Sequence, residues 1–225
     1  MIKPQEEDHD KSSTFLSRPL GKPRGFEKVL DKAILHLKKD KVMKKILSKY
    51  SIEKQTKYMN SLFVNLIDSI ISQQLSNKAA FAISKRFKSI FNSSPISPAL
   101  VLSTPDVNLK KSGLSAMKTV YIKGLAKAIE SKTIDVDSLH NLSDEDVIVQ
   151  LTKLKGIGRW TAEMFLIFSL KRPDIFSVGD LGLRTAVSKW YGVEIKDLKR
   201  IEEISKKWSP YRSFASRILW KSLEN

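Results

Sequence analysis

Cysteine is absent from this 225-residue chain, and histidine is scarce. Without cysteine the chain cannot form disulfides, thiolate zinc sites or a cysteine-ligated iron–sulfur cluster, and it offers no cysteine nucleophile. The three histidines, His9, His36 and His140, lie far apart and show no metal-ligand spacing. No apolar run approaches the roughly 18 residues of a membrane span. The opening residues, MIKPQEEDHDKSS, lack the apolar segment of a secretory signal, so we expect no membrane association.

Acidic residues are also in the minority. The chain carries 40 Lys and Arg against 24 Asp and Glu, a formal net charge of +16. Such an excess fits a polyanionic partner, above all nucleic acid. A soluble protein from an organism with lysine-rich proteins would show the same balance, so the charge alone leaves both interpretations open. The 41% of hydrophobic residues is enough for a packed globular protein.

Helical periodicity begins at Phe26, whereas residues 1–25 mix Pro, Gly and charges with little pattern and read as a loose N-terminal arm. Ser and Pro cluster in FNSSPISP (91–98), which predicts a break, and IFSV (175–178) reads as extended. Most other segments are helices of about 10–15 residues, which favours an all-α fold. We expect helices at about 26–37, 42–47, 63–71 running on into 72–87, 114–129, 143–155, 159–172, 180–191, 195–208 and 214–223.

The segment LTKLKGIGRWTAEMF (151–165) is the strongest local signal: a helix, a tight Gly-Ile-Gly turn and a second helix. The glycines allow a sharp turn and bring backbone N–H groups close to another molecule. The N-terminus of the second helix points the same way, a geometry that binds phosphate without reading base sequence. An ordinary helical hairpin with glycine at its bend is the alternative. The expected phosphate-binding residues are Lys155, Gly156, Ile157, Gly158 and Arg159.

This hairpin, followed by VGDLGLR (178–184), resembles the signature of the helix-hairpin-helix DNA glycosylases, and within them the alkyl-purine branch, the 3-methyladenine DNA glycosylase II type. Three further stretches resemble that branch: IISQQLSNKAA (70–80), GLSAMKTVYIKGLA (113–126) and WSPYRSFASRILW (208–220). The resemblance spans about 26–222 and implies one glycosylase domain over 26–225 without a separate N-terminal sheet domain. It implies two helical lobes with the active site in a cleft between them. We expect the hairpin and Asp180 in one lobe, together with the N-terminal helices, and SQQLS across the cleft.

The resemblance places the catalytic carboxylate on Asp180. Breaking an N-glycosidic bond builds positive charge on the sugar, and a fixed carboxylate beside C1′ would stabilise that charge. The same carboxylate could orient or deprotonate the attacking water. An aspartate after glycine at a helix start is commonly only an N-cap, and the hairpin upstream is what favours catalysis.

Trp160 bears on the type of reaction. In relatives that also cut the DNA strand, this position holds a lysine that forms a Schiff base with the sugar. With tryptophan there, we expect water as the nucleophile and no lyase activity. The resemblance also places Trp160, Trp220 and Met164 in the base pocket, where aromatic rings would attract a cationic alkylated purine. Met164 departs from the tyrosine of the larger bacterial enzymes, and either tryptophan could simply be helix-packing core.

The enzyme would have to flip the damaged nucleotide out of the duplex, and the resemblance assigns the plug that fills the gap to Gln74, with Leu75 and Ser76 beside it. A helix-end glutamine making capping bonds is the alternative. We expect double-stranded DNA with damaged purines as partner, a monomer, and no redox cofactor or catalytic metal. A Na⁺ or K⁺ ion at the hairpin carbonyls would fit the family. The expected location is the cytoplasm or nucleoid of a prokaryote, or a eukaryotic nucleus.

The expected function is hydrolysis of the N-glycosidic bond of alkylated purines, of the 3-methyladenine and 7-methylguanine type, at the start of base excision repair. An oxidised-purine glycosylase/lyase is one rival, and tryptophan at position 160 speaks against it. A non-catalytic helix-hairpin-helix DNA-binding module is the other, and Asp180 in its intact context speaks against that.

Overall fold

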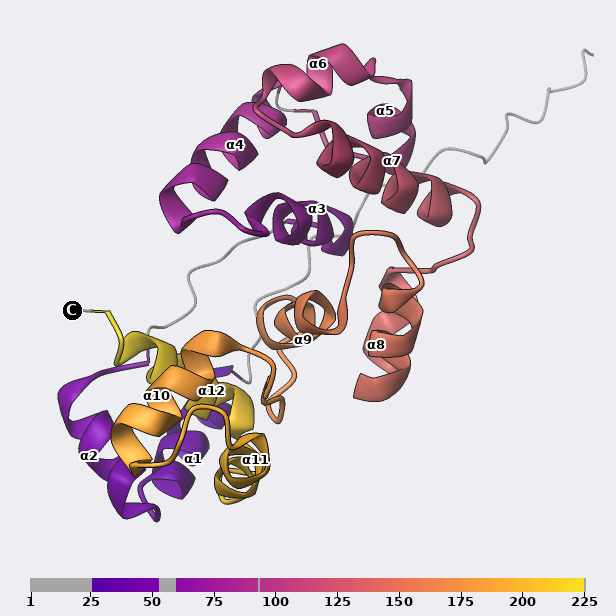
Figure 1. Ribbon diagram of the computed structural model, residues 1–225. Helices are drawn as coiled ribbons and strands as arrows, with labels where there is room; N and C mark the ends of the chain where they lie inside the picture. The colour runs from indigo at the N-terminus through magenta and orange to yellow at the C-terminus, as the bar shows by residue number, and fades with distance from the viewer. Residues whose placement is uncertain (1–25, 53–59, 93, 225) are drawn as a thin grey trace, which may run out of the picture.

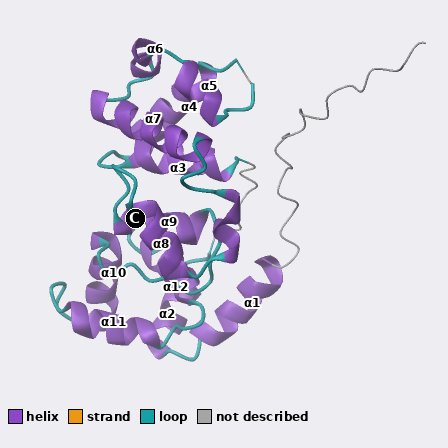
Figure 2. Cartoon of the chain, turned by 90° about the vertical axis from the view of Figure 1, so that its right-hand side faces the viewer, coloured by secondary structure: helices purple, strands orange, loops and turns teal. Residues whose placement is uncertain are grey.

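The structure is a computed structural model that describes residues 26–52, 60–92 and 94–224, so the expected arm at 1–25 lies outside the described residues. Within the described part, every regular element is helical, which confirms the all-α prediction (Figures 1 and 2). In the same part of the chain, no helix is long and apolar enough to cross a membrane. The helices gather around two separate hydrophobic cores.

The first core is built from the middle of the chain. Its elements are α3 (Leu62–Ser72), α4 (Asn77–Ser89), α5 (Pro98–Ser103), α6 (Asp106–Lys111), α7 (Ala116–Glu130), the 3-10 helix η1 (Asp137–Asn141), α8 (Asp144–Thr152) and α9 (Arg159–Phe168). Three of them, α5, α6 and η1, were not expected, because five or six residues give too little periodicity to detect. Helix α5 begins at the last residue of the predicted break, where Ser97 caps the helix and Pro98 occupies its first turn.

The second core joins the two ends of the chain. It holds α1 (Phe26–Leu37), α2 (Lys41–Lys49), α10 (Leu181–Tyr191), α11 (Leu198–Lys206) and α12 (Arg212–Lys221). Trp208 lies fully buried within it, against the rings of Phe176 and Tyr191. The N-terminal helices therefore pack with the C-terminal ones, as expected, and α10 begins directly after Asp180.

The hairpin, however, does not share a core with α10, and the expectation that the hairpin and Asp180 lie in one lobe was wrong. Helix α9 packs on α3, α8 packs on α9, and Ile157 at the bend is 3% exposed within the first core. The reason is the apolar face of α9, where Ala162, Phe165 and Leu166 are fully buried against that core. Figures 1 and 2 both show α9 between α3 and α12. Asp180 is hydrogen-bonded to Trp160 of α9 and to Trp220 of α12, which packs against both cores, so it lies where the two cores meet.

The chain between α9 and α10 is fastened to the start of α12. Asp174 accepts two hydrogen bonds from the Arg212 guanidinium, at 2.9 and 3.0 Å, and a third from the Ser209 hydroxyl at 2.8 Å. Ile175 N–H donates to the Ser213 hydroxyl at 2.9 Å. The guanidinium of Arg212 is thus engaged within the protein.

The Asp174–Arg212 pair should make stability pH-dependent. Burial alone would raise the pKa of Asp174, but hydrogen bonds from Arg212 and Ser209 outweigh it and hold that pKa below its ordinary value. A depressed folded-state pKa adds stability that is present above the unfolded value of about 3.9 and is lost as the pH falls through the folded value. Asp174→Asn should therefore lower the free energy of unfolding by about 1–2 kcal/mol at pH 7, and less in acid.

Urea unfolding of both proteins between pH 7 and pH 2.5 measures this difference. Glu203→Gln is the control, because Glu203 forms an exposed pair with Arg200 on one helix. Such a pair contributes about 0–1 kcal/mol. A wild-type advantage over Asp174→Asn that stays constant down to the lowest pH would contradict the account.

Candidate active site

Asp180 is the centre of the candidate site. It is the N-cap of α10, and its Oδ1 accepts a hydrogen bond from Leu183 N–H at 2.7 Å. Asp180 is therefore a helix cap, as one of the two interpretations predicted. Two more donors reach the same carboxylate: Trp160 Nε1 at 2.7 Å from Oδ2 and Trp220 Nε1 at 2.9 Å from Oδ1. Helix capping needs neither indole, so these two bonds call for another explanation.

The two tryptophans come from different elements, α9 and α12, and differ in exposure. Trp160 is 41% exposed, whereas Trp220 is half-buried and packs against both hydrophobic cores. Asp180 between them is only 9% exposed. The carboxylate thus sits at the meeting of the two cores with an accessible aromatic ring on one side. Charge-assisted hydrogen bonds of this kind are short and strong, and they fix the orientation of the carboxylate.

Two further side chains lie on the same face of α9 as Trp160, at the helical spacing of four residues. Met164, expected in the base pocket, is half-buried and packs against the first core. Phe168 is 42% exposed and stacks on Trp220, with ring centroids 5.7 Å apart. Phe168 was not among the expected site residues, and its position beside Trp220 was missed.

Gly182 provides the space in which Trp220 reaches Asp180. A Cβ atom at this position would lie 3.1 Å from Asp180 Oδ1 and 3.2 Å from Trp220 Nε1. Those contacts are tighter than ordinary van der Waals contact, so any larger residue would push the indole and the carboxylate apart. The glycine in GDLGL therefore serves the packing of this site.

The Gly-Ile-Gly bend has two different glycines. Gly156 adopts φ +88°, and a Cβ atom there would collide with the ring of Tyr121. Gly158 has an ordinary φ of −90° as the N-cap of α9, and a Cβ there would meet nothing within 4 Å. The open space around Gly158 leaves the backbone at the start of α9 accessible, as an approaching phosphate would require.

The basic residues of the hairpin differ in their freedom to bind an anion. Lys155 is exposed. Arg159 donates to both carboxylate oxygens of Glu145 at 2.9 Å and to Glu163 at 3.1 Å. Its guanidinium is thus committed to two carboxylates, and the backbone of the bend is the better candidate for phosphate contact.

The bend carbonyls also bear on the expected monovalent cation. The Gly156 oxygen accepts from Gln73 Nε2 at 2.7 Å. Within the described residues, the carbonyl oxygens of Lys155 and Ile157 receive no hydrogen bond. Neutral carbonyl oxygens suit an alkali cation, so these two fit the expected ion, which stays a proposal.

The loop between α3 and α4 faces the bend through Gln73, not through Gln74. Besides its bond to Gly156, Gln73 Nε2 lies 3.2 Å from Thr161 Oγ1. Lys118 of α7 donates to the carbonyls of Ile71 and Gln73 at 2.7 and 2.8 Å, and burial lowers the pKa of this lysine. The loop is therefore held on two sides. SQQLS lies next to the hairpin and in the same core, so the expectation that it lies across the cleft from the hairpin was wrong.

The three residues expected to form the plug project from this loop. Gln74 is exposed and adopts φ +56°, a strained value for a non-glycine residue. Leu75 is 38% exposed, and Ser76 caps α4. The residue that ends α3 is Gln73, not Gln74, and its side chain binds Gly156 and Thr161 instead of capping a helix. The sequence offered no means of telling the two glutamines apart, because either could have followed the last turn of α3.

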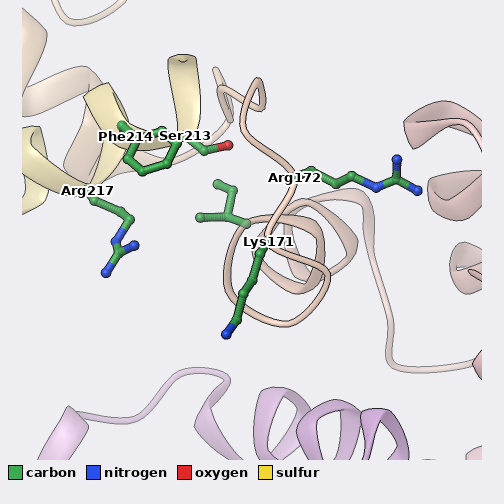
Figure 3. Close-up of a pocket in the computed structure, with 6 residues that line it drawn as sticks. Lys171, Arg172, Ser213, Phe214 and Arg217 are labelled. Carbon is green, nitrogen blue, oxygen red and sulfur yellow. The ribbon is translucent and has the colours of Figure 1, made fainter. Parts of the chain in front are cut away.

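Figure 3 shows a small pocket elsewhere, between the end of α9 and the start of α12. Its lining includes neither Asp180 nor either of the two tryptophans. Arg172, on its rim, donates to the carbonyls of His140 and Leu142 at 3.0 and 2.7 Å, which engages its guanidinium. The pocket therefore adds no group to the candidate site. Among the described residues, no cluster of three or more His, Asp or Glu side chains is placed to hold a metal ion.

The two hairpin glycines provide a matched test of the bend. Gly156→Ala should lower the free energy of unfolding by about 1–3 kcal/mol through its positive φ, and further through displacement of Tyr121. Gly158→Ala should change it by less than about 0.5 kcal/mol, because a methyl group there has space and an ordinary φ. Urea unfolding at neutral pH measures both. Equal losses in the two variants would contradict this geometry.

Comparison with known proteins identifies the family of this chain. The family model described as "HhH-GPD superfamily base excision DNA repair protein" matches residues 67–210. The DNA-3-methyladenine glycosylase 1 of Schizosaccharomyces pombe is 37% identical over 175 residues, which cover 76% of this chain and 75% of the relative. The DNA-3-methyladenine glycosylase of Saccharomyces cerevisiae is 34% identical over 206 residues, covering 75% of this chain and 70% of the relative.

The solved structures give the same result. The S. pombe 3-methyladenine DNA glycosylase Mag1 in complex with abasic DNA superposes with a TM-score of 0.79 at 34% identity, over 86% of this chain and 97% of that one. An 8-oxoguanine glycosylase/lyase from Clostridium acetobutylicum reaches 0.69 at 18% identity, over 85% of this chain and 69% of that one, and shares the fold alone.

Coverage of the bacterial relative is lower. The match to YfjP of Bacillus subtilis, 30% identical over 171 residues, takes in 73% of this chain but only 60% of that protein. The family model nevertheless covers more than half of this chain, including the hairpin, Trp160 and Asp180. The chain belongs to the HhH-GPD superfamily of base excision DNA repair proteins.

Proposed function

We propose that this chain is a monofunctional DNA glycosylase that hydrolyses the N-glycosidic bond of alkylated purines, with Asp180 as its catalytic carboxylate. The observation that carries the proposal is the carboxylate itself: nearly buried, fixed by two indole N–H groups from separate helices, and placed where the two cores meet. The names of the yeast relatives support 3-methyladenine and similar bases as substrates.

The expected chemistry follows from charge. As the bond between C1′ and the base breaks, positive charge develops on the sugar, and an adjacent carboxylate stabilises it without moving. Asp180 is suited to this because three N–H donors hold its two oxygens in place. Water then adds at C1′, and the base leaves with the electrons of the broken bond. An alkylated purine carries its own positive charge, so it leaves with little help from an acid.

The aromatic side chains would select such a base. A cation is attracted to the face of a tryptophan ring, by about 0.5–2 kcal/mol. Phe168 already covers one face of Trp220, at a centroid distance of 5.7 Å. The more exposed ring of Trp160 is therefore the better platform for the flipped base, with Met164 one turn further along the same helix face.

Trp160 also supports water, not an amine, as nucleophile. The side chain at position 160 reaches the Asp180 carboxylate, so a lysine here would lie beside the reacting sugar and could form a Schiff base. The indole cannot do so. The rival function, an oxidised-purine glycosylase/lyase, draws support only from fold likeness at 18% identity. The second rival, a module that binds DNA without chemistry, leaves the two indole bonds to Asp180 without a purpose.

The remaining residues of the proposal concern DNA. The backbone of Gly156, Ile157 and Gly158 would hold one phosphate, with Lys155 adding charge. A Na⁺ or K⁺ ion bound by the hairpin carbonyls would bridge to that phosphate. Gln74, Leu75 and Ser76, which project from a loop held by Gln73 and Lys118, would enter the duplex where the base has left. The partner is double-stranded DNA, bound by a monomer.

The test is base release from methylated duplex DNA. Wild type should release methylated purines, and Asp180→Asn should do so at least about 100-fold more slowly in single turnover. Strand breaks should appear only after alkali, because water leaves an abasic site and not a cut strand. The matched control is Asp197→Asn. Asp197 caps α11 just as Asp180 caps α10, accepting from Arg200 N–H at 3.0 Å, but the indole N–H groups of Trp160 and Trp220 donate to Asp180 and not to Asp197.

Three outcomes would contradict the proposal, each in a different part. Strand cleavage by wild type without alkali would overturn the argument from Trp160. An equal loss of rate in Asp197→Asn would make Asp180 a helix cap only. Tight binding of the duplex with no base released by wild type would favour the DNA-binding module.

A further inference from the structure

Helix α9 touches the chain that leads into α10 at two points. One is the bond from Trp160 Nε1 to Asp180. The other lies three residues further along the helix, where the Ser177 hydroxyl donates to Glu163 Oε2 at 2.5 Å. Ser177 is fully buried and Glu163 is 9% exposed, so water does not compete for this bond. Glu163 thus binds the segment that precedes Asp180 through a buried hydrogen bond.

Ser177 and Asp180 are the two ends of one turn. The backbone N–H of Asp180 donates to the carbonyl of Ser177 at 3.0 Å. A displacement of Ser177 therefore moves the backbone of Asp180 with it. The turn is held from α9 at both ends, by the carboxylate of Glu163 at Ser177 and by the indole of Trp160 at Asp180.

A buried glutamate is an unfavourable choice if stability were its only purpose. Its second oxygen, Oε1, accepts from Arg159 Nε at 3.1 Å, while the other nitrogens of that guanidinium bind the exposed Glu145. Desolvating a carboxylate is costly, and replacing buried ionic groups by apolar residues of similar size is often neutral or stabilising. An apolar residue could accept neither bond, but Arg159 would keep Glu145 as its partner, and only the bond to Ser177 reaches the turn before Asp180.

We propose that Glu163 is a positioning residue: by holding the Ser177 hydroxyl, it fixes the turn that presents Asp180 to the sugar. The catalytic part of this proposal rests on the proposed function, whereas the geometric part, that Glu163 fixes the Asp180 turn, does not. Holding a catalytic group in place has a large effect on rate, since a misplacement of about 1 Å can cost about 100-fold.

The decisive variants are Glu163→Met and Ser177→Ala. Methionine matches the length of glutamate and can pack where the carboxylate lies, and alanine removes only a hydroxyl. Each should lower the single-turnover rate of base release at saturating enzyme by roughly 10- to 100-fold. Affinity for the duplex should not fall in either variant. The urea midpoint of Glu163→Met should fall, because the buried Ser177 hydroxyl loses its acceptor, and Ser177→Ala, which removes the donor, separates this loss of stability from the loss of rate. The double variant should lose no more than the more damaged single variant, because both substitutions break one contact.

Glu145→Met is the matched control. Glu145 binds the same Arg159 guanidinium but does not contact Ser177. Its rate should equal that of wild type. A loss as large as that of Glu163→Met would assign the effect to the charge of the Arg159 cluster and overturn the proposal, as would full activity in Glu163→Met and Ser177→Ala.

A second readout does not depend on activity. The indole N–H of Trp160, identified in an NMR spectrum by its absence from Trp160→Phe, reports its hydrogen bond to Asp180. Its resonance should move upfield in Glu163→Met and Ser177→Ala and stay in place in Glu145→Met. If wild type releases no base but the resonance still shifts in the two variants, the proposed function is refuted and the positioning of Asp180 stands. A loss of rate without a shift would overturn the positioning.

Discussion

The structure depends on three N–H groups that donate to one carboxylate, that of Asp180. Asp180 accepts from its own helix through Leu183, from α9 through Trp160 and from α12 through Trp220. The helices that bring these donors belong to two different cores, so neither half of the chain could form the site alone. Burying a charge is costly unless it is hydrogen-bonded, which makes these three donors a condition for placing an aspartate here at all.

That constraint accounts for residues that otherwise look unrelated. Gly182 leaves room for the indole of Trp220 beside Asp180, and the Asp174–Arg212 pair fastens the start of α12, the helix that carries Trp220. Glu163 lies on α9 one turn after Trp160 and binds the other end of the Asp180 turn. The same helix begins at the Gly-Ile-Gly bend, so the surface expected to hold a phosphate and the carboxylate expected to face the sugar are fixed by one rigid element.

The sequence predicted what local chemistry decides. Helical periodicity located the long helices, the glycines located the bend, and the resemblance to a known family singled out Asp180. Sequence-based prediction failed where a structural feature depends on packing between distant segments. Helices α5 and α6 are too short to show a helical period. The position of the hairpin depends on which of the two cores buries the apolar face of α9. Which glutamine binds the bend, Gln73 or Gln74, is decided only when α3 packs against the hairpin. The contact of Glu163 with Ser177 likewise forms only when the Asp180 turn packs against α9.

The central claim is that the Asp180 carboxylate stabilises positive charge on the deoxyribose, and it can be measured without any lesion. Duplexes of one sequence would carry either a cationic pyrrolidine or a neutral tetrahydrofuran in place of one sugar, and the Kd of each would be determined at one fixed salt concentration. The account predicts that wild type binds the cationic duplex at least about 100-fold more tightly, and that Asp180→Asn loses this preference while still binding the neutral duplex. Equal affinity of wild type for the two duplexes, or an undiminished preference in Asp180→Asn, would contradict it.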